Sequence, residues 1–152
     1  MGWEDLRIDG TRVRLRPARG DDVPAIAPWY DGAEVVRPEA TDGILVITRA
    51  GADEPIGLLR YRAGEPAEGW VTIGCVVLAG EARRRGLGAD AVQLFEEAVA
   101  RRYGVRHFRA GVDAGNGLSL YFWLRLGYRP LGWAADEQGT AVFSVARQAV
   151  GP

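Results

Sequence analysis

Lysine is absent from this sequence, and asparagine occurs only once, at Asn116. All 19 basic residues are therefore arginine. Because the codons for lysine and asparagine are rich in A and T, we attribute this bias to a GC-rich bacterial genome. Such a genome favours arginine at every position that needs a cation, so the number of arginines alone does not indicate a function.

Cysteine is almost absent as well. Cys75 is the only one, which excludes an intramolecular disulfide. No apolar run approaches the ~18–20 residues that a membrane-spanning helix needs. The opening residues MGWEDLRIDG lack the basic and apolar segments of a signal peptide. We therefore expect a protein of the reducing cytoplasm that has no membrane partner.

Neither sign of charge is in excess. The formal net charge is −1, whereas a nucleic-acid-binding protein usually carries a basic surplus, so we expect no nucleic-acid partner. His107 is the only histidine and has no cluster of metal ligands around it in the sequence, so we expect a structural or surface position for it and no metal site. A length of 152 residues with 47% apolar and 26% charged residues predicts one globular domain over residues 1–152.

The hydrophobic periodicity predicts alternating strands and helices. The expected order is strand, helix, three strands, helix, strand, helix and two strands. This order indicates an α/β (α+β mixed) fold, with a mixed sheet of about six or seven strands flanked by helices. The expected strands cover residues 11–16, 44–49, 56–62, 70–78, 107–112, 128–133 and 140–146, and the longer helices cover 88–103 and 118–126.

The most informative segment is residues 81–89 (EARRRGLGA), between the longest predicted strand and the longest predicted helix. Gly86 and Gly88 allow a tight turn because they have no Cβ. The helix that follows offers unpaired N–H groups and the positive end of its dipole, which favour a phosphate or pyrophosphate. A tight turn with a solvated basic edge is the alternative, because short glycine motifs are weak signals. Three arginines add positive charge beside the turn: Arg83, Arg84 and Arg85.

This turn resembles the Gln/Arg-x-x-Gly-x-Gly/Ala signature of the GNAT acetyltransferases. A second segment, residues 116–128, is similar to the family's Asn-x-x-Ala/Ser, an aromatic residue and then Gly-Phe/Tyr. Two motifs in the family's order and at its separation make the resemblance specific, and it covers roughly residues 11–147. It implies an acetyl-coenzyme A-dependent N-acyltransferase whose central sheet is mixed and mostly antiparallel.

The resemblance also implies which residues hold coenzyme A. In the family, the amides of the loop bind the pyrophosphate, and the end of the preceding strand exchanges backbone hydrogen bonds with the pantetheine arm. The strand-end residues here are Val76, Val77 and Leu78. The loop residues are Arg83, Arg84, Arg85, Gly86, Leu87, Gly88 and Ala89.

The second motif adds three cofactor candidates. Asn116 either caps the following helix or binds the pantetheine arm, and Ser119 is either a first-turn residue or a cofactor contact. Trp123 stands where the family often has a tyrosine that is thought to protonate the leaving thiolate. An indole cannot act as that acid, so the acid is absent or supplied by water. Trp123 then packs on the pantetheine arm or forms a wall of the acyl pocket. Neighbouring Tyr121 should face elsewhere and Tyr128 should lie in the core.

The acceptor side is less defined. Asp113 is the candidate catalytic carboxylate, because some related aminoglycoside acetyltransferases carry an aspartate shortly before the same asparagine, where it meets the substrate amine. A turn-forming or capping aspartate is the alternative. The loop that covers the acceptor site in this family holds four acidic residues here, which either attract a cationic amine or are solvated. They are Asp31, Glu34, Glu39 and Asp42.

These residues lead us to expect transfer of an acetyl group from acetyl-coenzyme A to a primary amine. A small cationic amine such as an aminoglycoside is the first choice, and a peptide amine of a protein N-terminus or ribosomal protein is the alternative. A noncatalytic acyl-coenzyme A-binding module is a third alternative, which is favoured by Trp123 and by a central strand without carboxylates. Cys75 on that strand is interpreted as a small buried residue. The sequence is also compatible with a homodimer.

Overall fold

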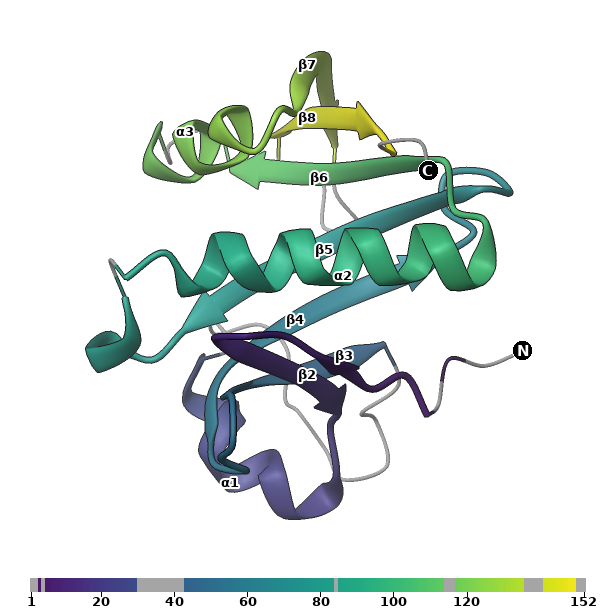
Figure 1. Cartoon of the computed structure of the whole chain (residues 1–152). Helices are drawn as coiled ribbons and strands as arrows, with labels where there is room; N and C mark the ends of the chain where they lie inside the picture. Colours follow the sequence, from purple (N-terminus) through teal and green to yellow (C-terminus); the bar gives the residue numbers. More distant parts are fainter. Residues whose placement is uncertain are drawn as a thin grey trace. The chain divides into compact units, whose positions relative to one another are not determined.

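The computed structural model describes residues 3, 5–29, 43–83, 85–113, 117–135 and 141–149. Eight strands of this described part form one mixed sheet in the order β1-β2-β3-β4-β5-β6-β8-β7 (Figure 1). The strands are β1 (Ile8–Asp9), β2 (Val13–Pro17), β3 (Ile44–Arg49), β4 (Pro55–Ala63), β5 (Trp70–Leu78), β6 (His107–Asp113), β7 (Arg129–Ala135) and β8 (Ala141–Gln148). The helices are α1 (Val23–Ile26), α2 (Leu87–Tyr103) and α3 (Gly117–Arg125), with short 3-10 turns η1 (Gly20–Asp22), η2 (Ala27–Trp29) and η3 (Gly80–Ala82).

This architecture confirms the predicted fold class and corrects the expected strand number. The additional strand is β1, whose Ile8 and Asp9 pair with Leu15 and Arg14 of β2. A strand of two residues is too short to show a periodicity in the sequence. It forms only because it pairs with β2. Tyr128 was expected inside a strand, but β7 begins one residue later, at Arg129.

The contacts of the chain divide it into two compact units. The first contains Met1–Tyr61 and Val76–Phe95, and the second contains Arg62–Cys75 and Glu96–Pro152. In the described part of the chain, no helix is both long enough and apolar enough to cross a membrane.

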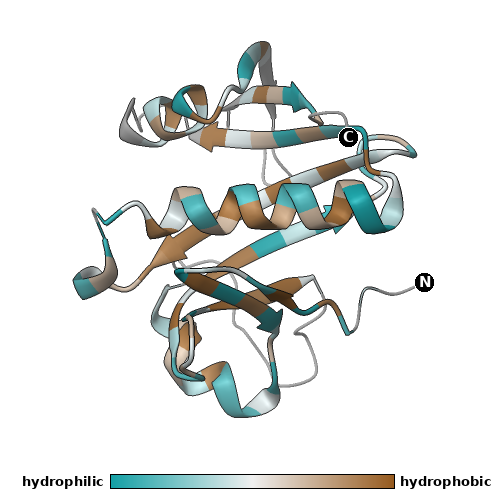
Figure 2. Ribbon diagram, in the orientation of Figure 1, coloured by the Kyte–Doolittle hydropathy of each residue, from teal (hydrophilic) through white to brown (hydrophobic). Residues whose placement is uncertain are grey.

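The first unit is built on the antiparallel strands β1 to β4. Residues 44–47 of β3 are all buried, which matches a run of apolar residues covered on both faces. On the same unit, α2 buries Ala91, Val92 and Phe95, so its apolar stripe recurs at helical spacing (Figure 2). Trp3 stacks on Tyr61 with ring centroids 5.2 Å apart, and this pair holds the start of the chain against the unit.

A buried ion pair fixes the start of α1. Arg16 is 2% exposed, and its two terminal nitrogens lie 2.8 and 2.9 Å from the two carboxylate oxygens of Asp22. Asp22 also accepts the backbone N–H of Arg19 at 2.7 Å, which closes the turn η1 directly before α1. Burial alone would raise the pKa of Asp22, but these hydrogen bonds hold it below its usual value.

The second unit combines β6, β8 and β7 with α3. β8 pairs antiparallel with β6 from His107–Gln148 to Asp113–Val142 and also pairs with β7. The β7 pairing is irregular between Pro130 and Gly132. The first half of β5 runs parallel to β6, from the pair Trp70–His107 to the pair Ile73–Ala110, before β5 continues to Leu78.

Candidate functional site

The glycine turn opens α2 as the sequence predicts. Gly86 has a φ of +75°, in the left-handed region that favours glycine, and its carbonyl accepts the N–H of Asp90 at 3.0 Å. Gly86 therefore occupies the cap position of α2, and the first-turn N–H groups have no carbonyl of their own helix to bind. A helix start of this kind is a site for an anion such as pyrophosphate.

One arginine that the sequence analysis did not identify holds this turn. Arg12, just before β2, donates from Nη1 to a carboxylate oxygen of Asp90 at 2.8 Å and from Nη2 to the carbonyl of Arg85. These two acceptors flank Gly86, so one guanidinium group braces both sides of the turn. The pairing spans 73 residues in sequence, and in a chain whose cations are all arginine nothing marks Arg12 as special.

Arg83 links the loop to the end of β5. Its Nε donates to the carbonyl of Leu78 at 3.0 Å, which leaves the exposed guanidinium beside the strand end. Arg85 is also exposed, while Leu87 and Gly88 are buried at the start of α2. Arg84 lies outside the described residues. Of the two loop arginines that the structure describes, Arg83 therefore lies at the strand end and Arg85 lies just before the helix start.

The last three residues of β5 are only partly covered, whereas its first half contains two buried residues. Val71 and Ile73 are buried, whereas Val76, Val77 and Leu78 are each only half-buried. Three apolar residues in a central strand are normally covered on both faces, so their exposure marks a surface that a ligand can cover.

Gly57 of β4 is the second glycine that the site requires. A Cβ at this position would overlap the carbonyl oxygen of Val77 and the side chain of Leu78. The carbonyl of neighbouring Ile56 accepts the N–H of Ala79 at 2.7 Å. The backbones at Gly57 and Val77 thus approach more closely than any other residue type at position 57 would permit.

Trp123 occupies the end of α3 as a packing residue. It is 4% exposed. Its carbonyl accepts the N–H of Tyr128, and the carbonyl of Leu124 accepts the N–H of Gly127, whose φ is +94°. This is a Schellman ending, which typically brings an apolar contact between these positions. Here that contact is the edge-on packing of Trp123 on Tyr128, with ring centroids 4.8 Å apart.

The other tyrosine positions agree with the sequence analysis. Tyr121 is 59% exposed and lies under the guanidinium of Arg125, 5.6 Å from the ring centroid, so it faces away from the buried indole. Tyr128 is fully buried and belongs to the core, as predicted. Ser119 lies half-buried in the first turn of α3.

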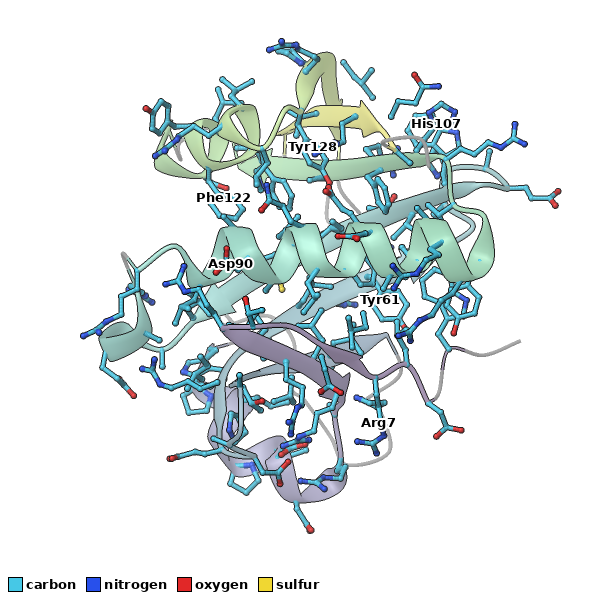
Figure 3. The ribbon with its side chains drawn as sticks, viewed as in Figure 1. Arg7, Tyr61, Asp90, His107, Phe122 and Tyr128 are labelled. Atoms are coloured by element: carbon cyan, nitrogen blue, oxygen red, sulfur yellow. The ribbon has the colours of Figure 1, made fainter. Side chains whose placement is uncertain are left out.

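The phenol of Tyr128 belongs to a buried polar network that sequence reasoning missed. The hydroxyl of Tyr128, which is labelled in Figure 3, donates to the carboxylate of Glu96 on α2. Arg147 donates to the other oxygen of Glu96 at 3.3 Å and to the carbonyl of Leu126 at 2.7 Å. Burial and the adjacent carboxylate raise the pKa of Tyr128, so its proton stays on the phenol.

Glu96 is a buried carboxylate that the sequence pattern did not identify. Burial raises its pKa, although the hydrogen bond from Tyr128 and the charge of Arg147 oppose the shift. The available signal was its place on α2, four residues after Val92 and three before Val99, which puts it at the edge of the apolar stripe.

The acceptor candidates are only partly described. Asp113 is the last residue of β6, and its backbone pairs with Val142. Its place at a strand end agrees with the sequence analysis, and α3 begins at Gly117, directly after Asn116. Asn116 itself and the four acidic residues of the predicted acceptor loop, Asp31, Glu34, Glu39 and Asp42, lie outside the described residues.

The described residues do not bring three or more metal-ligating side chains together. His107 stacks on Trp70 with ring centroids 4.6 Å apart, which agrees with a structural position for it. Cys75 is half-buried, so the prediction that it is buried was only partly right.

Solved structures with the same fold are numerous. An acetyltransferase of the GNAT family from Bacillus anthracis is 14% identical, with a TM-score of 0.77 over 94% of this chain and 98% of that one. A probable GNAT-family acetyltransferase from Chromobacterium violaceum is 20% identical, with a TM-score of 0.78 over 95% of this chain and 87% of that one. A ribosomal-protein-S5-alanine acetyltransferase from Vibrio fischeri is 14% identical, with a TM-score of 0.73 over 95% and 97%.

Comparison with curated protein sequences gave no significant match. The model of the acetyltransferase (GNAT) family, in contrast, matches residues 12–128. This stretch includes β2, the glycine turn, Trp123 and Tyr128, and it begins at the arginine that braces the turn. The chain therefore belongs to the GNAT family of acetyltransferases.

Proposed function

We propose that this protein transfers an acetyl group from acetyl-coenzyme A to a primary amine. The observation that carries the proposal is the turn at Gly86, which opens a helix of 17 residues with arginine side chains fixed beside it. Family membership supplies the reaction class. The turn supplies what acetyl-coenzyme A needs, because N–H groups and guanidinium groups are the natural partners of a pyrophosphate.

The described residues fit coenzyme A. In this proposal, the loop from Arg83 to Ala89 holds the pyrophosphate, and the backbone of Val76, Val77 and Leu78 holds the pantetheine arm. The resemblance of residues 116–128 to the family's second motif adds Asn116, Ser119 and Trp123 to the proposed cofactor contacts. The half-buried strand end and the fixed position of Arg83 on the Leu78 carbonyl support this arrangement.

Bound acetyl-coenzyme A supplies the thioester carbonyl that the amine attacks. A backbone N–H near Val76 or Val77 meets the negative charge that develops on the carbonyl oxygen. Asp113 pairs with the acceptor ammonium and orders the water that takes its proton. Much of the rate then comes from holding amine and thioester in one orientation.

The leaving thiolate receives its proton from water in this proposal. Trp123 has no acidic proton to give, and the Tyr128 hydroxyl is already committed to Glu96. We therefore expect Trp123→Phe to retain appreciable turnover, with a lower melting temperature because the contact with Tyr128 shrinks. Steady-state kinetics with saturating acetyl-coenzyme A measure this. A fall on the order of 10²-fold with intact cofactor binding would instead identify a proton donor at this position.

A small cationic amine such as an aminoglycoside is the proposed acceptor class. The acidic residues Asp31, Glu34 and Asp113 provide the charge for it. The second candidate is a ribosomal-protein amine, because chains of this fold include a ribosomal-protein-S5-alanine acetyltransferase and a putative ribosomal-protein-serine acetyltransferase.

Release of free thiol from acetyl-coenzyme A tests the reaction. We expect release to rise above the rate of hydrolysis with at least one member of a panel that contains aminoglycosides, polyamines and peptides with free N-termini. Stimulation by peptides alone would transfer the assignment to the protein-directed alternative. Tight binding of acetyl-coenzyme A without stimulation by any amine would indicate a noncatalytic acyl-coenzyme A-binding module.

A further inference from the structure

We infer that Arg12 is a positioning residue for the pyrophosphate of coenzyme A, which it serves without contacting the reacting atoms. The inference rests on the proposed function. We infer two roles for Arg12. It holds the backbone of the turn in the conformation that presents the first-turn N–H groups of α2, and it neutralises a carboxylate that would otherwise repel the ligand.

The first role follows from the two acceptors of Arg12. One is the carbonyl of Arg85, on the residue before Gly86, and the other is the carboxylate of Asp90, one helical turn after it. The guanidinium also lies against Gly86, with Nη1 3.5 Å from the point where a Cβ would stand. The loop backbone and the first turn of α2 are thereby tied to a common point next to β2.

The second role follows from the charge of Asp90. This carboxylate lies in the first turn of α2 (Figure 3), where it suits the helix dipole but is close to the site proposed for a pyrophosphate. Two anions at one helix start repel each other unless a cation lies beside them. Arg12 is that cation, at 2.8 Å from Asp90. Its second hydrogen bond goes to the backbone carbonyl of Arg85, which carries no net charge.

A purely structural role explains this pair less well. The side chains of Arg12 and Asp90 are 51% and 33% exposed, and an ion pair with this exposure contributes little to folding stability. The shape of the guanidinium matters more, because only its planar fork can bridge two acceptors in fixed directions. Lysine at position 12 would retain the charge and lose one of the two contacts.

Arg12→Met tests the inference, with Arg14→Met as the matched control. Arg14 lies two residues later and pairs with Asp9, away from the turn. We expect Arg12→Met to weaken coenzyme A binding by about 10–100-fold in calorimetry, because the turn loses a charge-assisted bond and its neutralising cation. Arg12→Lys should fall between wild type and Arg12→Met. The melting temperatures of both methionine variants should stay close to that of wild type.

Two further measurements separate positioning from a general loss of structure. S-acetylpantetheine lacks the pyrophosphate, so its turnover with the acceptor amine should be the same in wild type and Arg12→Met. The double variant Arg12→Met/Asp90→Asn should regain part of the lost affinity, because the repelling carboxylate is gone.

Each contrary result has a distinct meaning. Unchanged coenzyme A affinity in Arg12→Met, an equal loss in Arg14→Met, or an equal loss with S-acetylpantetheine would overturn the role of Arg12 while the proposed function stands. A failure of the wild-type protein to bind coenzyme A would overturn both.

Discussion

Replacing Gly86 with valine is expected to lower the affinity for acetyl-coenzyme A on the order of 100-fold. Gly86 has a φ of +75°, a conformation that a β-branched residue adopts only as an outlier. To escape it, the turn must rotate, which redirects the first-turn N–H groups of α2 and displaces the guanidinium of Arg12. The loss of one or two charge-assisted hydrogen bonds, each worth about 1.5–3 kcal/mol, accounts for the expected fall. Calorimetric titration with acetyl-coenzyme A measures it.

Gly104 provides the matched control at the other end of the same helix. Its φ is +70°, its N–H binds the carbonyl of Ala100, and nothing lies within 4 Å of where its Cβ would stand. Gly104→Val therefore carries a similar backbone penalty, roughly 1–2 kcal/mol, and should reduce the melting temperature without affecting acetyl-coenzyme A binding. Equal affinity losses in the two variants would show that the turn at Gly86 is not the binding site.

Asp113→Asn is expected to reduce kcat/KM for the acceptor amine by about 10–100-fold. The substitution retains the shape of the side chain and removes its charge, which costs one charge-assisted bond of about 1.5–3 kcal/mol to the acceptor ammonium. Affinity for acetyl-coenzyme A should change little. Initial-rate kinetics with both substrates varied distinguish the two effects.

Asp21→Asn is the control for removing one negative charge, because this exposed aspartate lies in the turn before α1 and outside the proposed site. It should leave the acceptor kinetics unchanged. If Asp113→Asn weakens the cofactor while the acceptor kinetics stay normal, the aspartate braces the turn that leads to Asn116. A lower melting temperature with normal kinetics would give the same answer.

The elements that are determined by local sequence were predictable. β3 and β5 begin and end at the predicted residues. Both are runs of β-branched and apolar residues between turn residues, so the sequence itself limits where each strand can begin and end. α2 ends at Tyr103, the last residue of the predicted helix, and Gly104 directly after it has the left-handed conformation typical of a helix end. Gly86 was likewise visible as a turn glycine, since a strand and a helix on either side of it are both strongly patterned.

The contacts that fix the site were not predictable, because they join residues that are far apart in sequence. Arg12 reaches the turn across 73 residues, and Glu96 meets Tyr128 across 32. Periodicity describes which face of an element is apolar, but it does not say which distant polar group will be buried with it. The same holds for Gly57, because only the position of the Val77 carbonyl in the folded chain shows that a side chain at residue 57 would not fit.

β7 lies at one end of the strand order, and its chemistry limits what else can join the sheet there. Pro130 offers no N–H to an incoming strand, and the irregularity between Pro130 and Gly132 bends the strand locally. Leu131 is 61% exposed between them, so a straight strand here would present both an apolar side chain and a hydrogen-bonding template. A proline and a bulge both weaken such a template, so we expect this margin to resist aggregation by strand addition.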